Sequence, residues 1–199
     1  MVISAVLLAS GASKRLGRPK QLLPWGNNFL INKIIEIIQN SNVDEIILVL
    51  GYEFSNMVEY IDKDVTIVNN NVWRLGKSTS IKKGLAAIQA DANAVIFFTI
   101  DQPFLATSLI NQLIDKANTT QASIISTHCN GINTVPMLFK RECFPQLNAL
   151  EMEQGGKKII NCREYQVEYV NWEDKRILID IDTEEDYNKA LKLENKSFI

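Results

Sequence analysis

The stretch VISAVLLASGASKRLGRPK, Val2–Lys20, begins with a continuous apolar run and continues into small and cationic residues. The run Val2–Leu8 does not alternate polar and apolar residues, which is typical of a strand buried on both faces of a parallel sheet. The small residues 9–13 that follow allow backbone N–H groups to approach an anion closely. Because ligands of parallel α/β sheets bind beyond the carboxyl ends of the strands, this stretch predicts an α/β fold with an anion site.

Apolar runs recur along the chain and alternate with segments of helical periodicity. We expect strands over Val2–Leu8, Glu45–Leu50, Val65–Val68, Ala94–Ile100, Ala122–Thr127, Pro136–Phe139, Gln166–Val170 and Ile177–Ile181. Helices are expected over Phe29–Asn40, Phe54–Ile61, Ser78–Gln89, Ser108–Asn118 and Thr183–Leu193. This order predicts a three-layer α/β/α fold with a mainly parallel, Rossmann-like sheet and a small mixed β region toward the C-terminus. No linker or repeat divides the 199 residues, so we expect a single domain over residues 1–199.

Composition narrows the function classes. A net charge of -2 argues against a general nucleic-acid binder. The longest apolar runs are too short for a membrane span or a signal peptide, so we expect a cytoplasmic protein without a membrane partner. Cys129, Cys143 and Cys162 lack metal or disulfide spacing and are expected to be free thiols. His128 is expected to be structural, because nothing near it in the sequence completes a triad or metal set.

Four cations follow the small residues and could neutralise a polyphosphate, arginine through forked hydrogen bonds and lysine as a point charge. They are Lys14, Arg15, Arg18 and Lys20. The segment is neither a Walker A loop nor a GxGxxG fingerprint, since five residues separate Gly11 from Gly17 and no GK[ST] follows. The alternative is a solvated basic turn. Its place directly after the first buried strand favours the anion site.

Four segments resemble, in order, the motifs of the MobA-like nucleotidyltransferases. LLASGASKRLGRPKQLLPWG, Leu7–Gly26, resembles LAAGxSxRMGxxKxLLpwg of the cytidylyltransferase branch, and RLGKSTSIKKGL, Arg74–Leu85, resembles GMSSSLRAGL. FFTIDQPFL, Phe97–Leu105, is similar to a DQPxv strand end, and DIDTEED, Asp180–Asp186, to DIDTpeD. The closest resemblance is to the molybdenum cofactor cytidylyltransferases. It implies a fold of the nucleotide-diphospho-sugar transferase type, with the nucleotide bound by residues 1–105 and the acceptor by the remainder.

In that family a substrate phosphate attacks the α-phosphorus of a nucleotide and pyrophosphate leaves, a reaction promoted by positioning and charge neutralisation. The resemblance implies catalytic roles for Arg15, Lys20 and Asp101, and a Mg²⁺ cofactor held by Asp101 with Asp182. It also implies nucleotide-binding roles for Leu8, Ala9, Ser10, Gly11, Ala12, Ser13, Lys20, Gly76, Ser78, Ser80 and Gln102. The alternative for Asp101 and for Asp182 is that each caps a helix, and Asp180 is a lesser candidate ligand.

Two motif positions bear on the substrates. The guanylyl branch tends toward LAGG and the cytidylyl branch toward LAAG, whereas this chain has Leu8-Ala9-Ser10-Gly11. A side chain at position 10 takes room that a purine needs, so CTP is expected. The family's GDxGAR segment reads Met152-Glu153-Gln154-Gly155-Gly156-Lys157 here, and its G-x-P reads Thr134-Val135-Pro136. Pro136, Gly155 and Lys157 are the expected acceptor-binding residues, the last two at a helix start, where phosphates bind.

The leading hypothesis is therefore transfer of CMP from CTP to a phosphorylated pterin, the molybdopterin-type cofactor, which a molybdoenzyme then receives. One alternative is a cytidylyltransferase for a sugar or polyol phosphate. Another is a non-catalytic protein that binds a nucleotide or cofactor, which would not need both Asp101 and Lys20.

Overall fold

The computed structural model describes residues 1–196, with side chains to residue 194. Seven strands form one sheet in the order β5-β4-β1-β6-β8-β7-β9. Their bounds are β1 Ile3–Ala9, β4 Glu45–Leu50, β5 Thr66–Asn69, β6 Ala94–Thr99, β7 Ile124–Cys129, β8 Ile132–Lys140 and β9 Val167–Asn171. Neighbouring strands are parallel except where β8 pairs with β6 and β7. The expected mixed region is thus one reversed strand inside the main sheet.

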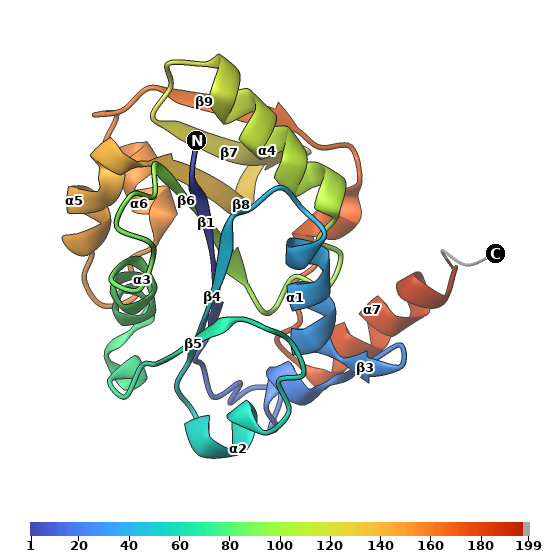
Figure 1. Ribbon diagram of the computed structural model, residues 1–199. Helices are drawn as coiled ribbons and strands as arrows, with labels where there is room; N and C mark the ends of the chain where they lie inside the picture. The colour runs from blue at the N-terminus through green and yellow to red at the C-terminus, as the bar shows by residue number, and fades with distance from the viewer. Residues whose placement is uncertain (197–199) are drawn as a thin grey trace.

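Helices cover both faces of this sheet (Figure 1). One face packs against α1 (Leu30–Gln39), α4 (Thr107–Thr119) and α7 (Glu184–Lys196). The other packs against α3 (Lys77–Leu85), α5 (Phe144–Asn148) and α6 (Gly156–Asn161). The remaining elements are α2 (Phe54–Val58), a ribbon of β2 (Pro24–Trp25) and β3 (Asn28–Phe29), and short 3-10 turns at Lys20–Leu22, Trp73–Leu75, Arg141–Cys143 and Lys175–Leu178. These layers confirm the expected three-layer α/β/α architecture.

The first strand divides the core into its two halves. Ala5 and Leu7 face the cluster beneath α1 and α4, whereas Val6 and Leu8 face the cluster beneath α3 and α5. Alternate side chains of a strand point to opposite faces, so a strand covered by helices on both faces is buried at every position, and Ser4, its one polar residue, donates to the Glu45 carboxylate. This explains why the run after Val2 has no polar alternation.

The strand expected over Ile177–Ile181 is wrong. Lys175–Leu178 forms a 3-10 turn, and Asp174 caps it by accepting the N–H of Arg176 at 3.0 Å. Ile177 and Ile181 are nonetheless fully buried. The apolar spacing therefore reflects burial of single side chains, and the N–H of Ile181 donates to the carbonyl of Asp101 at 2.8 Å instead of pairing in the sheet.

Two further expectations are refined. The helix expected over Ser78–Gln89 runs from Lys77 to Leu85, and Gly76 is its N-cap without a side-chain cap bond. The helix expected over Phe54–Ile61 ends at Val58. Among the described residues, no helix combines the length and apolar character required to cross a bilayer.

Candidate active site

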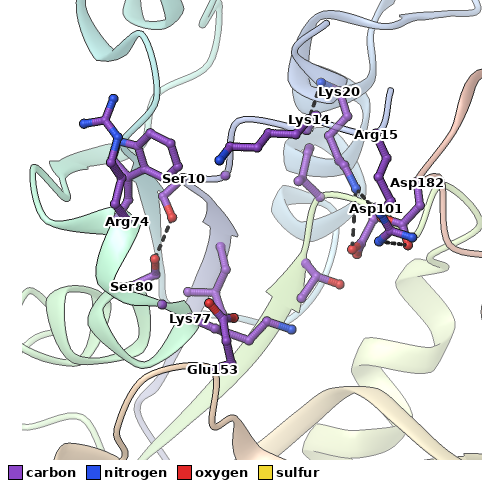
Figure 2. Close-up of a pocket in the computed structure, with 17 residues that line it drawn as sticks. Ser10, Lys14, Arg15, Lys20, Arg74, Lys77, Ser80, Asp101, Glu153 and Asp182 are labelled. Atoms are coloured by element: carbon purple, nitrogen blue, oxygen red, sulfur yellow. Dashed lines mark hydrogen bonds and ion pairs between the residues drawn. The ribbon is translucent and has the colours of Figure 1, made fainter. Parts of the chain in front are cut away.

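A cavity of about 560 Å³ opens at the carboxyl ends of β1 and β6 (Figure 2). It is lined by five cationic and three acidic side chains, an excess of positive charge that favours an anionic ligand. The lining residues are Leu8, Ser10, Gly11, Ser13, Lys14, Arg15, Lys20, Trp73, Arg74, Gly76, Lys77, Ser80, Thr99, Ile100, Asp101, Glu153 and Asp182.

The loop after β1 carries backbone N–H groups without a partner among the described residues, and Gly11, Ser13, Lys14 and Arg15 of this loop line the cavity. Ser13 has a φ of 50°, and its carbonyl accepts the N–H groups of Leu16 and Gly17 in a tight turn. The fully buried Gln21 side chain donates to the carbonyls of Ala9 at 2.6 Å and Gly11 at 3.1 Å. Within residues 1–196, no protein acceptor takes the N–H groups of residues 11–15. Consecutive free N–H groups of this kind bind phosphate oxygens.

Lys20 joins three distant parts of the chain at the edge of the cavity. Its buried ammonium donates to the carbonyl of Ile181 at 2.7 Å and to the Asp182 carboxylate at 3.2 Å, and lies 3.8 Å from the Asp101 carboxylate. Arg15 pairs with the other oxygen of Asp182 at 2.8 Å. The sequence reasoning placed these four charged residues at one site, and the structure brings them together.

Three cations differ from the expectation: one lies outside the cavity, and two that were not expected at the site line it. Arg18 pairs with Glu184 at 2.8 Å and lies over the ring of Tyr187. It is outside the cavity and does not contribute to the anion site. Arg74 and Lys77 do line the cavity. The sequence does contain a signal for these two residues. Both lie within three residues of Gly76, in the same way that cations lie close to the glycines of the first loop.

The residues expected to bind the nucleotide divide into two groups. Leu8, Ser10, Gly11, Ser13, Lys20, Gly76 and Ser80 line the cavity. Ala9, Ala12, Ser78 and Gln102 do not. Ala9 is buried in the sheet, and the N–H of Ser78 donates to the carbonyl of Met152, on the far side of α3. Gln102 lies in a second, adjoining cavity and donates to Thr134 at 2.9 Å.

Position 10 is fixed between two neighbours. The Ser10 hydroxyl is 2.6 Å from the Ser80 hydroxyl, which also accepts a hydrogen bond from the buried Asn70 amide at 3.0 Å. On the other side, a Cβ added to Gly51 would lie 2.9 Å from the Ser10 Cβ. The Ser10 side chain therefore takes up space at the cavity wall and cannot turn away easily.

The second cavity, of about 300 Å³, lies against the first. Leu8, Lys77, Thr99, Asp101 and Glu153 line both. Of the expected acceptor-binding residues, Gly155 and Lys157 line the second cavity, but Pro136 does not. The carbonyl of Pro136 accepts the Thr127 hydroxyl at 2.8 Å, and its neighbours Val135 and Met137 form the wall instead.

The carboxylates at the junction have distinct environments. Partial enclosure by protein raises the pKa of Asp180 in the second cavity, and the nearby charge of Asp101 raises it further. The helix-cap alternative for Asp182 is wrong, because Thr183 and Asp186 form a reciprocal capping box with N–H to oxygen distances of 2.9 and 3.2 Å. Asp101 is no cap of α4 either, since that helix begins at Thr107.

Asp101 and Asp182 are the expected ligands for a hard cation, and in the structure both lie near the Lys20 ammonium, with Asp182 also paired to Arg15. Among residues 1–196, no group of three or more His, Cys, Asp or Glu side chains is placed to hold a metal. Mg²⁺ is commonly held by one or two carboxylates together with waters and substrate phosphates, so the two carboxylates on either side of the Lys20 ammonium fit that ion. The third carboxylate, Asp180, remains a secondary candidate.

The histidine and the cysteines lie away from both cavities. His128 shares a hydrogen bond of 2.7 Å with Asn133 and packs against Tyr169. Cys129, Cys143 and Cys162 are free, and burial raises the pKa of Cys143 to about 12. These residues take no part in the site, as expected.

Comparisons with known proteins show what the chain is similar to in sequence and fold. A family model described as the MobA-like NTP transferase domain matches residues 5–169. The molybdenum cofactor cytidylyltransferase of Escherichia coli K12 is 30% identical over 94% of this chain and 95% of its own length. A probable molybdenum cofactor guanylyltransferase of Natranaerobius thermophilus is 26% identical over 83% and 80%. The crystal structure of Rv0371c from Mycobacterium tuberculosis superposes with a TM-score of 0.87 at 25% identity over 96% and 98%, which confirms the expected fold.

Proposed function

The chain belongs to the MobA-like NTP transferase family, and we propose that it transfers CMP from CTP to the phosphate of a molybdopterin-type cofactor. The observation that carries the proposal is the pair of adjoining cavities with Asp101 in their shared wall. One cavity has the charge and the free N–H groups for a triphosphate, and the other has a lysine and an apolar floor for a phosphorylated ring compound. The name of the Escherichia coli relative, molybdenum cofactor cytidylyltransferase, describes a transfer of this kind in that protein.

The triphosphate would bind between the first loop and the cations of the cavity. The N–H groups of residues 11–15, with Lys14 and Arg15, would hold the β- and γ-phosphates and stabilise the pyrophosphate that leaves. Gln21 contributes indirectly, because it occupies loop carbonyls that would otherwise repel the phosphates.

Asp101 and Asp182 would hold Mg²⁺, which neutralises charge on the phosphate oxygens when bound. Lys20 keeps these two carboxylates at one edge of the cavity and ties both to the carbonyl of Ile181. Transfer is then mainly a matter of placing an acceptor phosphate oxygen in line with the α-phosphorus.

The preference for cytosine rests on Ser10. Its hydroxyl is held against Ser80 and its Cβ is backed by Gly51, so the space beside Leu8 is smaller than it would be with glycine at position 10. A pyrimidine fits a smaller space than a purine does.

For the acceptor, the floor of the second cavity is formed by Ile81, Phe97, Met137 and Phe139, and Lys157 adds charge at its rim. A Cβ at Gly156 would lie 2.6 Å from the Phe139 ring, so glycine lets α6 approach this floor closely. An apolar lining together with a cation suits a pterin phosphate better than a polyol phosphate, which has few apolar atoms.

The test is pyrophosphate release from CTP or GTP with Mg²⁺, with molybdenum cofactor, a sugar phosphate, a polyol phosphate or no acceptor. We expect release with CTP and molybdenum cofactor only. If pyrophosphate is released with another phosphorylated compound, that compound and not the pterin is the acceptor. A chain that binds CTP but releases no pyrophosphate with any acceptor would be a nucleotide-binding protein instead. Asp101→Asn serves as the inactive control.

A further inference from the structure

One cation stands in the wall that the two cavities share. Lys77, the first residue of α3, is the only cation among the five residues that line both cavities. A Cβ added to Gly155 would lie 3.5 Å from the Lys77 Cδ, so the stem of the lysine passes close to the acceptor side. In Figure 2 its ammonium points into the space between Glu153 and the side that carries Asp101.

The Lys77 ammonium is also free to bind a ligand. Lys20 is engaged by Ile181 and Asp182, and Arg15 is engaged by the same carboxylate. The Lys77 side chain makes no hydrogen bond or ion pair with any described residue, although Asp101 and Glu153 also line both cavities. An ammonium that lies in the wall of both cavities without a partner among the described residues is suited to bind an anionic group of a ligand, because a charge-assisted hydrogen bond is strong.

The charge at this position is a property of this chain. Residues Gly76–Ser80 read GKSTS, and the motif that this segment resembles reads GMSSS, so Lys77 stands where that motif has a methionine. A methionine could pack at the junction but could not neutralise a phosphate.

We propose that Lys77 is a catalytic residue that binds the α-phosphoryl group as it passes from nucleotide to acceptor, which rests on the proposed function. In that step an acceptor phosphate oxygen forms a bond to the α-phosphorus. The bond from phosphorus to the α–β bridging oxygen breaks, and pyrophosphate leaves with the electron pair. The transferred group is bonded first to a group in one cavity and then to a group in the other, so it must occupy their common space. Lys77 neutralises its non-bridging oxygens there.

The first test measures turnover. Lys77→Met is expected to lower kcat for pyrophosphate release by about 100-fold, as for loss of one donor to a developing charge, and to raise the KM for CTP by at most about tenfold, because CTP also carries the α-phosphate. Lys77→Arg should restore part of the rate. Lys83→Met is the matched control, because Lys83 is an exposed lysine of the same helix outside both cavities, and its rate should equal that of the wild type. Equal rates for Lys77→Met and the wild type would overturn the role.

The second test needs no turnover and uses calorimetry with CMP and with inorganic pyrophosphate. Lys77→Met should weaken CMP binding by about tenfold and change pyrophosphate binding by less than about twofold, since only CMP carries the α-phosphate. Equal weakening of both ligands, weakening of neither, or a wild type that binds pyrophosphate but not CMP would overturn the proposal. If the wild type releases no pyrophosphate with any acceptor, the proposed function fails, and the CMP measurement still decides the role of Lys77.

Discussion

The substitution Gly76→Ala tests how the nucleotide side of the site is joined to the acceptor side. Gly76 has a φ of 112°, in the region that residues with a side chain rarely adopt. A Cβ at this position would lie 2.3 Å from the carbonyl oxygen of Met152, and the same oxygen accepts the N–H of Ser78 at 2.9 Å. Alanine must therefore adopt a strained backbone and also push residue 152 away.

Two terms set the magnitude. The strained dihedral costs about 1–3 kcal/mol, and forcing an extra methyl group into a packed contact costs about 1–3 kcal/mol. We expect the free energy of unfolding to fall by about 2–6 kcal/mol, because both terms apply at once. Met152 would have to retreat by roughly 1 Å to reach ordinary van der Waals contact, which would displace the wall that Glu153 gives to both cavities.

Urea unfolding followed by circular dichroism measures this loss, with Gly11→Ala as the matched control. Gly11 has no atom within 4 Å of an added Cβ and no positive φ, so its substitution should change the free energy of unfolding by less than about 1 kcal/mol. A Gly76→Ala protein as stable as the Gly11→Ala protein would refute the reasoning.

Four other outcomes are expected. Asp101→Asn should slow pyrophosphate release by about 100-fold or more; an unchanged rate would remove this carboxylate from the reaction. Gln21→Met should weaken pyrophosphate binding about tenfold in calorimetry, because two loop carbonyls lose their donor; undiminished affinity would contradict that role. Arg18→Ala should leave CTP affinity unchanged and lower the free energy of unfolding by at most about 1 kcal/mol, since its ion pair is exposed. A large drop in CTP affinity would place this arginine in the cavity after all. Because the pKa of Asp180 is raised in the fold, its contribution to stability is lost as pH rises through that pKa. Asp180→Asn should thus be more stable than the wild type at neutral pH in urea unfolding, with a gain that shrinks in acid; a gain that grows in acid would be inconsistent.

The parts of the fold that could be predicted are those determined by the residues of a single segment. The β1 strand is recognisable from its unbroken apolar run, and Glu45–Leu50 was placed with the bounds that the structure has. The segment Ile177–Ile181 was wrongly predicted to be a strand. Buried isoleucines can have the same spacing in a strand and in a turn that packs on the core. What decides between the two is the hydrogen bond from Ile181 to Asp101, a contact between distant segments.

In the site, too, the parts that depend on contacts between distant segments were the ones that could not be predicted. Lys20 and Asp101 were placed together by the family resemblance, and the structure supplies the reason: they follow β1 and β6, neighbouring parallel strands whose ends meet at one edge of the sheet. Arg18 could not be excluded from the sequence, since its partner Glu184 lies at the start of the last helix. Lys77 was overlooked because a single lysine at a helix start is common on protein surfaces, and only the arrangement of the two cavities gives it significance.

The contact of Lys20 with Ile181 and Asp182 has a consequence for biosynthesis of the protein. When β9 has just left the ribosome, every strand of the sheet has been produced, yet Ile181 and Asp182, which hold the Lys20 ammonium, are still in the exit tunnel. Catalytic competence should therefore appear late, after the sheet can form. A growing chain would be protected from drawing nucleotide into a half-built site.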